Sequence, residues 1–368
     1  MKTISVAAAA GCALLAYIAF AQSPATGPNK VVKTAKVGGE GGFDYIYADA
    51  DGRKLYIPRS GQQNARITAF NLDTLAPLGE IPNINAHGVA VDTKSGHGFA
   101  SSNPVAMFDT KTLALIKTIP VEGNPDGILA DPFNQRIYIL SHRAPNATVI
   151  NAADGSIAGT IDLGGAPEQA ATDGKGHIYI DIEDKNNIAV VDAKTMTVTG
   201  HYDLEGKGNG PGGLALDAKN HILFAACHEP AVMVILNSDT GKIITTLPIE
   251  GGTDGAGFNP NTLEAFSSQG NGTLTVIKEL SPTNFEVEQT VQTMVGARTM
   301  TVDSKANHVL TMSFEYGPTP APSAAPPAAP PAGAQGGTGR GFGGGRGRGP
   351  ARGPQLPDSF TIVEVGTK

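Results

Sequence analysis

A short phrase recurs along this chain at a near-constant interval, and this repetition restricts the fold more than any other feature of the sequence. Each copy joins an apolar stretch, a turn and a second apolar stretch, as in GILADPFNQRIYIL and GLALDAKNHILFAA. The Asp or Asn that ends the first stretch recurs every 39 to 44 residues, at Asp49, Asp92, Asp131, Asp173, Asp217, Asn259 and Asp303. A fixed period of this length is typical of repeat architectures. The sequence therefore indicates seven copies of one structural unit.

Each unit has the pattern of four short β-strands. After the repeated phrase come a third apolar segment, such as IAVVD, and a fourth, such as KIITTL. These segments are short, rich in β-branched residues and bounded by turn formers, which favours strands over helices. An Asp followed by Thr or Gly between the third and fourth segments suits a tight hairpin, because Asp can bond its own backbone. No segment is a convincing helix.

Seven units of four antiparallel strands predict an all-β, seven-bladed β-propeller. A single blade cannot cover both of its faces, so neighbouring blades must stack and share a core. The last unit ends in DSFTIVEVGTK, which supplies a third strand and no fourth. The segment KVVKTAKVGG near the N-terminus matches the fourth-strand segment ALIKTIPVEG. We therefore expect residues 31–37 to complete the last blade and to protect two strand edges that would otherwise promote aggregation.

The repeated phrase also carries a resemblance to a known family. The run PDGILADPFNQRIYIL, followed by ATVINAADGSIAGTI, resembles the YVTN-repeat, YncE-like bacterial β-propeller proteins. The likeness extends over nearly all of the chain after residue 21, and it implies the propeller fold without a particular activity. Two other kinds of propeller fit less well. The chain has no Trp for the blade motif of quinoprotein dehydrogenases, and AACHEP lacks the first Cys of a haem attachment motif.

The N-terminus has the composition of a secretory signal peptide. Lys2 precedes an apolar run, and the small residues of Ala19-Phe20-Ala21 form a cleavage site. A retained membrane anchor is the alternative, but Gly11 interrupts the run. We expect a signal peptide over 1–21, a linker over 22–30 and the propeller over 31–368. Only Cys227 would then remain, which excludes an intramolecular disulfide. We therefore expect a periplasmic or secreted protein whose mature chain has no transmembrane segment. We also expect it to be a monomer.

Residues 317–357 interrupt the last unit with a Pro/Ala-rich part followed by a Gly/Arg-rich part. Such a composition has almost nothing apolar to bury, so we expect a disordered insertion. The insertion holds four arginines and no acid, and the signal peptide holds one lysine, which leaves 22 basic and 34 acidic residues elsewhere. The acidic body argues against polyanion binding by the ring itself. The Arg/Gly segment suits contact with a polyanion, a lid over the acidic mouth, or simply a solvated linker.

A propeller brings two sets of loops to one face around its central channel: those that lead into the innermost strands and those that join second to third strands. Variable loops on a rigid ring commonly form a binding site. The first set contributes Asp44, His87, Asp126, Glu168, Asp254 and Arg298. The second contributes Arg59, Asn103, His142, Arg143, Glu183, Asp184, His228, Glu229, Gln269 and Glu315. We take these residues as ligand-binding candidates.

Two interpretations of these polar residues remain open. Asp126 and Asp254 each precede Gly, so they could simply bond the backbone of turns. Alternatively, carboxylates crowded around a channel repel one another, and a divalent cation or a basic ligand would relieve this repulsion. We expect a module that binds a small molecule, a protein or another cell-envelope partner at the channel mouth. The alternative is a metal-assisted hydrolase or lyase that uses His87, His142 or His228 with nearby carboxylates.

Overall fold

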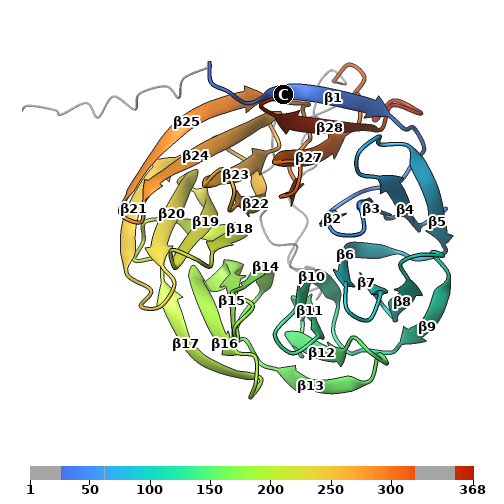
Figure 1. Cartoon of the computed structure of the whole chain (residues 1–368), viewed down its shortest axis with the longest axis horizontal. Coiled ribbons are helices and arrows are strands. Elements are labelled where there is room, and N and C mark those ends of the chain that lie inside the picture. Colours follow the sequence, from blue (N-terminus) through green and yellow to red (C-terminus); the bar gives the residue numbers. More distant parts are fainter. Residues whose placement is uncertain (1–25, 62, 320–352) are drawn as a thin grey trace, which may run out of the picture.

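The computed structural model of the chain describes residues 26–61, 63–319 and 353–368. In these residues the strands form seven four-stranded antiparallel sheets, arranged as blades around a central channel (Figure 1). One short 3-10 helix, η1 (Glu183–Lys185), is the only helical element of the described ranges. Among these residues, no helix has the length and apolar character needed to cross a bilayer. The predicted all-β, seven-bladed propeller is confirmed.

In the first six blades the strands run in chain order from the channel outwards. Blades 1 to 3 comprise β2 (Tyr47–Asp49), β3 (Lys54–Arg59), β4 (Arg66–Asn71) and β5 (Pro77–Pro82); β6 (Ala86–Asp92), β7 (His97–Ser102), β8 (Val105–Asp109) and β9 (Leu115–Ile119); and β10 (Pro125–Asp131), β11 (Arg136–Ser141), β12 (Ala147–Asn151) and β13 (Ile157–Ile161). Blades 4 to 6 comprise β14 (Pro167–Thr172), β15 (His177–Ile182), β16 (Asn187–Asp192) and β17 (Thr197–Asp203); β18 (Asn209–Asp217), β19 (Ile222–Glu229), β20 (Val232–Asn237) and β21 (Ile243–Pro248); and β22 (Thr253–Asn259), β23 (Glu264–Gln269), β24 (Thr273–Ser281) and β25 (Asn284–Gln292).

The seventh blade joins the two ends of the described chain. It comprises β26 (Met300–Asp303), β27 (His308–Ser313) and β28 (Thr361–Gly366), with β1 (Lys30–Lys36) on its outer edge. β1 runs antiparallel to β28, and the backbone N–H groups of Val37 and Gly38 extend the pairing to the carbonyl of Phe360 at 2.9 and 3.1 Å. The expected closing strand, residues 31–37, therefore differs from β1 by one residue at each end.

The residue used to align the repeats has a structural reason to recur. At the end of every innermost strand its side-chain oxygen accepts a hydrogen bond from a backbone N–H two or three residues further on, as Asp49 does from Gly52 at 2.8 Å and Asp217 from Lys219 at 2.9 Å. The other five innermost strands have the same bond. Asp and Asn suit this position because their short side chains reach their own backbone. The repeat interval therefore marks the turn after each innermost strand.

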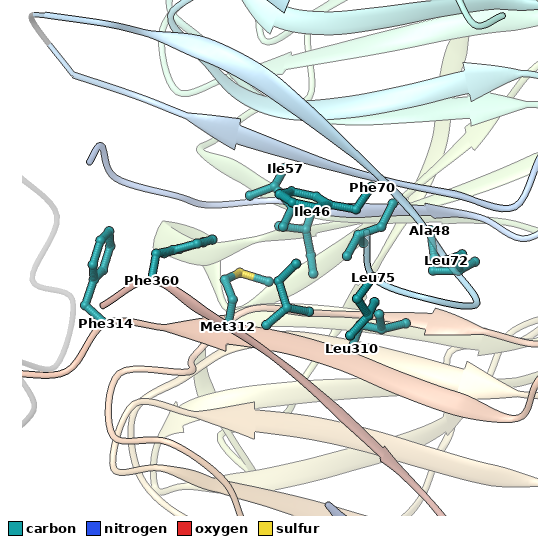
Figure 2. Close-up of a cluster of buried hydrophobic side chains, with 12 residues drawn as sticks. Ile46, Ala48, Ile57, Phe70, Leu72, Leu75, Leu310, Met312, Phe314 and Phe360 are labelled. Atoms are coloured by element: carbon teal, nitrogen blue, oxygen red, sulfur yellow. The ribbon is translucent and has the colours of Figure 1, made fainter. Parts of the chain in front are cut away.

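The hydrophobic core lies between the blades, in seven clusters that each join two neighbours around the ring. Figure 2 shows the cluster between blades 1 and 7, where Ile57 and Phe70 face Leu310 and Phe360 across the gap between two sheets. Such apolar burial is the main favourable term in folding. Each blade contributes half of two cores, which explains why one copy of the repeated phrase is not enough to fold.

Two predicted segments lie wholly or largely outside the described residues. The signal peptide, 1–21, and most of the insertion, 320–352, lie outside the described residues. The described ends of the insertion pair with each other: Gly317 N–H donates to Pro354 at 2.8 Å and Leu356 N–H to Glu315 at 2.8 Å. The end of the predicted linker is likewise held in place, because Asn29 exchanges two backbone to side-chain hydrogen bonds with Gln289 of β25.

Candidate ligand site at the channel mouth

Innermost strands of four consecutive blades bring five candidate residues together. His87, Asp126 and Glu168 are each the second residue of their strand, on β6, β10 and β14, and Asp44 lies just before β2. His142 directly follows β11. These innermost strands surround the channel as neighbours (Figure 1), so equivalent positions on them converge. We call Asp44, His87, Asp126, His142 and Glu168 the mouth cluster.

Each imidazole of the mouth cluster lies between two carboxylates. The Nδ1 atom of His87 is 3.4 Å from Asp44 Oδ2 and 3.4 Å from Asp126 Oδ1. The Nε2 atom of His142 is 3.6 Å from Asp126 Oδ2 and 3.1 Å from Glu168 Oε1. Asp126 therefore presents a different oxygen to each imidazole. The structure brings these five of the candidates together, and no distance between them could be inferred from the loop positions alone.

The carboxylates of this cluster are buried and its imidazoles are more open. Asp44, Asp126 and Glu168 are 7%, 5% and 3% exposed, whereas the side chain of His87 is 46% exposed. Burying a carboxylate without a compensating partner is costly. Nevertheless, Oδ1 of Asp126 accepts no hydrogen bond, and Nε2 of His142 is not aligned for one despite its 3.1 Å contact with Glu168. Asp126 and His142 therefore keep buried polar atoms that the hydrogen bonds of the cluster do not saturate.

This crowding shifts the protonation of the cluster. Burial and the neighbouring Asp44 raise the pKa of Asp126 above its usual range. The Glu168 carboxylate raises the pKa of His142 to about 9, against the opposing effect of burial. The carboxylates around His142 therefore favour its protonated form. A bound cation would take the place of that proton, because it too would neutralise the surrounding carboxylates.

Close packing of the blades fixes the cluster. A Cβ atom on Gly127, next to Asp126, would lie 2.4 Å from the carbonyl oxygen of Glu168, so only glycine lets these two strands approach. Buried Ser101 of β7 joins the same region, since its Oγ accepts from Gly88 N–H at 2.8 Å and donates to Asp126 O at 2.5 Å. The backbone next to His87 is thereby tied to the backbone of Asp126.

The expected turns at Asp126-Gly127 and Asp254-Gly255 are wrong. Both pairs lie inside strands, β10 and β22. Gly127 is needed for the close approach of Glu168, and not for a change of chain direction. The interpretation of these two acids as turn-capping residues therefore fails, because the turns are capped at the other end of the innermost strands.

The structure adds two residues that the sequence reasoning missed. Tyr45 follows Asp44 and donates its hydroxyl to Glu168 Oε2 at 2.6 Å, and burial raises the pKa of this phenol well above its usual value. Asp181 of β15 is fully buried beside Glu168, and its Oδ1 accepts the Gln169 N–H at 2.5 Å. Tyr45 could have been noticed as the neighbour of Asp44. The only sign of Asp181 was one acid in the apolar run IYIDI.

Two further pairs of candidates lie near the channel without joining the mouth cluster. Arg298 forms an ion pair with Asp254, and it lines a pocket of about 260 Å³ together with Asp44 and His87. His228 Nε2 lies 3.9 Å from Glu183 Oε1. Cys227, beside His228, is fully buried, and burial raises the pKa of its thiol to about 12. A thiol with this pKa is not a nucleophile at neutral pH.

The structure places Arg59 elsewhere. Its side chain is buried between blades 1 and 7, where the guanidinium donates to the carbonyls of Gly38 and Gly39 at 3.3 and 2.9 Å. The guanidinium carbon lies 3.7 Å from the ring centroid of Phe360. Burial, with a smaller contribution from Arg66, lowers the pKa of Arg59 to about 10. This residue belongs to the ring closure.

The remaining candidates are not part of the mouth cluster either. Asn103 and Arg143 are exposed in loops, and Asn103 donates to the Gly123 carbonyl at 3.4 Å. Glu229 is the exposed last residue of β19. Gln269 is buried at the end of β23, where it accepts a hydrogen bond from Thr273 at 3.0 Å. Position in a loop could not show which side chains turn towards the channel.

The donor atoms of the mouth cluster suit a metal ion. Within the part of the chain that the structure describes, two groups of three residues have ligand atoms within 4.8 Å of one another: Asp44, His87 and Asp126, and Asp126, His142 and Glu168. Imidazole nitrogen and carboxylate oxygen are the donors that zinc and other divalent transition metals use in proteins. The predicted divalent cation thus has a plausible set of ligands.

The comparisons with known proteins supply no further information about the site. No protein-family model matches this chain, and no curated protein matches it. The resemblance to the YVTN-repeat, YncE-like proteins therefore stays a prediction, whereas the propeller architecture stands on the structure itself.

Proposed function

We propose that the protein is an exported binding module whose channel mouth takes up a cationic ligand. The observation that carries this proposal is the burial of three carboxylates within one cluster, of which one oxygen of Asp126 accepts no hydrogen bond. His142 offsets part of this negative charge, because its raised pKa favours the protonated imidazole. A cation that enters the site would interact with all three carboxylates in surroundings of low polarity, where charge interactions are strong.

Thermal unfolding in the presence of cations of known identity tests this proposal. Purified protein beginning at Gln22 would be melted alone, with Zn²⁺, with Mn²⁺, with Ca²⁺ and with spermidine. A ligand present at 100 times its dissociation constant stabilises the folded state by about 2.7 kcal/mol, which is a measurable rise in melting temperature. The double variant Asp126→Asn, Glu168→Gln should lose this rise. The proposal fails if no cation stabilises the protein, or if the double variant responds as the wild type does.

Export is a separate part of the proposal, and it rests on the composition of residues 1–21. Fractionation of cells that express the full chain would show mature protein outside the cytoplasm, with an N-terminus at Gln22 by mass spectrometry. Accumulation of uncleaved protein in the cytoplasm would contradict this part alone.

A second candidate function is a metal-assisted hydrolase or lyase, and the two imidazoles of the mouth cluster are the observation that favours it. Three protein ligands leave a coordination position for water, as in catalytic zinc sites, and a bound metal ion lowers the pKa of that water. His87 and His142 are placed for this role, whereas His228 lies with Glu183 outside both three-residue groups. This candidate is excluded if the purified protein contains no stoichiometric metal and a chelator does not change its melting temperature.

A further inference from the structure

We propose that the mouth cluster holds two divalent transition-metal ions side by side, with the Asp126 carboxylate as the bridge between them. This inference rests on the proposed function, because it names the cation that the channel mouth takes up. The first ion would be bound by Asp44, His87 and Asp126, and the second by Asp126, His142 and Glu168.

The first argument comes from the two oxygens of Asp126. Oδ1 lies 3.4 Å from the Nδ1 atom of His87, and Oδ2 lies 3.6 Å from the Nε2 atom of His142. Each oxygen therefore belongs to a different three-residue group. A carboxylate that uses one oxygen for each of two metal ions is suited to the separation of about 3.5 to 4 Å found in two-metal sites. The side chain is 7% exposed, and its buried Oδ1 atom accepts no hydrogen bond although it faces His87.

The second argument comes from the spacing of the donor atoms. Two ligands that are each 2.0 to 2.1 Å from a tetrahedral zinc ion lie roughly 3.3 to 3.4 Å apart. The nitrogen to oxygen distances in the first group are both 3.4 Å, and those in the second group are 3.6 and 3.1 Å. Most of these separations are long for hydrogen bonds but close to the edges of a metal coordination polyhedron. Small side-chain adjustments would complete both sites.

The third argument is the balance of charge. One divalent ion would leave the three carboxylates with a net charge of about −1 if both imidazoles are neutral, and of about zero if the imidazole that binds no metal is protonated. Two divalent ions would instead give a net charge of about +1, which favours water, hydroxide or an anionic ligand in the open positions. The pocket of about 260 Å³ beside Asp44 and His87, which Arg298 also lines, offers space for such a ligand.

Hydrogen bonds around the cluster orient the ligands, as they do in established metal sites. Tyr45 donates to Glu168 Oε2 at 2.6 Å, so Oε1 is left to face His142. Ser101 ties the strand of His87 to the strand of Asp126 through Gly88 N–H and Asp126 O. Glu168 and Asp126 are therefore positioned before any ion arrives.

Zinc ions are preferred to calcium or magnesium by the nature of the donors. Calcium takes six to eight oxygen ligands and magnesium a nearly ideal octahedron of oxygens, whereas each group here offers two carboxylates and one imidazole. Zinc, cobalt, manganese and iron all accept this mixture of donors.

The test is the number of ions bound by metal-free protein after equilibrium dialysis against Zn²⁺, measured by elemental analysis. Wild-type protein should bind two zinc ions per chain. His87→Ala and His142→Ala should each bind one, and Asp126→Ala should lose both at the same free zinc concentration. The matched control is His221→Ala, which removes an exposed imidazole 2.9 Å from Asp239 and should still bind two ions. Circular dichroism melts would verify that every variant is folded.

A spectroscopic measurement keeps the proposal testable if a variant does not fold. Two Mn²⁺ ions joined by a carboxylate are magnetically coupled, so wild-type protein loaded with Mn²⁺ should give the broad electron paramagnetic resonance spectrum of a coupled pair. His87→Ala or His142→Ala should give the six-line spectrum of an isolated ion.

Four results would overturn the two-ion site. A single zinc ion in wild-type protein that is lost in both histidine variants would mean one shared site. Two zinc ions that remain in Asp126→Ala would mean that this residue is no bridge. If zinc does not bind while spermidine still stabilises the wild type and not the double variant, the metal site is wrong and the cation-binding function stands. If no cation stabilises the protein, both proposals fail.

Discussion

Phe360 offers the most quantitative test of how the ring is closed. Its ring is fully buried directly before β28, with its centroid 4.9 Å from that of Phe314 and 5.6 Å from that of Phe43. The Arg59 guanidinium lies 3.7 Å from the same centroid. These neighbours come from β3 and from the segments after β1 and β27, so a single side chain joins blade 1, blade 7 and the N-terminal segment.

Phe360→Ala should lower the free energy of unfolding by about 4 kcal/mol, within the range of about 3 to 5 kcal/mol for large cavities. Phe360→Leu should lower the free energy of unfolding by about 2 kcal/mol. Leucine keeps most of the side-chain volume. It loses the aromatic pairs, which contribute about 0.5 to 1.5 kcal/mol each, and the contact with Arg59.

The measurement is urea unfolding followed by circular dichroism and by tyrosine fluorescence, with free energies compared where the two transitions coincide. The control is Phe133→Ala, whose side chain is exposed and should cost less than about 1 kcal/mol. A loss below about 1 kcal/mol for Phe360→Ala, or an equal loss for Phe360→Leu, would refute the account of this closure.

Three further predictions concern the closing strand β1, the hydrogen bond from Tyr45 to Glu168, and the buried acid Glu279. Protein that begins at residue 37 lacks β1, which leaves the edge of β28 exposed. It should melt at a lower temperature by circular dichroism, and it should aggregate through this edge, as measured by light scattering. Tyr45→Phe should weaken zinc binding at the Glu168 site about 10-fold by calorimetry and leave the other site unchanged. Burial, with a smaller contribution from Asp217, raises the pKa of Glu279 to about 7. The folded state therefore holds this proton more tightly than the unfolded state, so stability should fall as the pH rises from about 4.5 to 8. In Glu279→Gln the stability should depend less on pH, and at pH 8 the variant should be up to about 2 kcal/mol more stable than wild type in urea titrations. A pH profile equal to that of the wild type would contradict the assignment.

The repeats determined the fold because the same local physics acts in every copy. The Asp or Asn after each innermost strand caps a turn with its own side chain, so the turn is written into a few adjacent residues. The closing strand could also be located, since the last unit lacks one strand and residues 31–37 match the missing pattern. These features depend on neighbours in sequence or on a repeated pattern, and both are visible without coordinates.

The site was predictable only as a face of the molecule. His87, Asp126 and Glu168 converge because equivalent positions on neighbouring innermost strands meet at the channel, and Asp44 before β2 and His142 after β11 join them. By contrast, Arg59 is the last residue of β3 and turns into the core, where the carbonyls of Gly38 and Gly39 accept its hydrogen bonds. Side-chain direction depends on packing between blades that are distant in sequence, which no single repeat encodes.

Glycines next to the site show the same limit. Gly127 resembles a turn residue in the sequence PDG, yet its role is to let the backbone of Glu168 come close. This requirement arises from a strand about forty residues away in the chain. Of the two interpretations that the sequence left open for Asp126, the one based on local turn rules is therefore wrong.

The central claim of this account is that the mouth cluster binds divalent transition-metal ions, and X-ray diffraction from zinc-soaked crystals at the zinc absorption edge tests it most directly. The account predicts two anomalous peaks on either side of the Asp126 carboxylate, one next to His87 and one next to His142, about 4 Å apart. Crystals with no anomalous peak at the channel mouth, or with zinc only at exposed pairs such as His221 and Asp239, would contradict it.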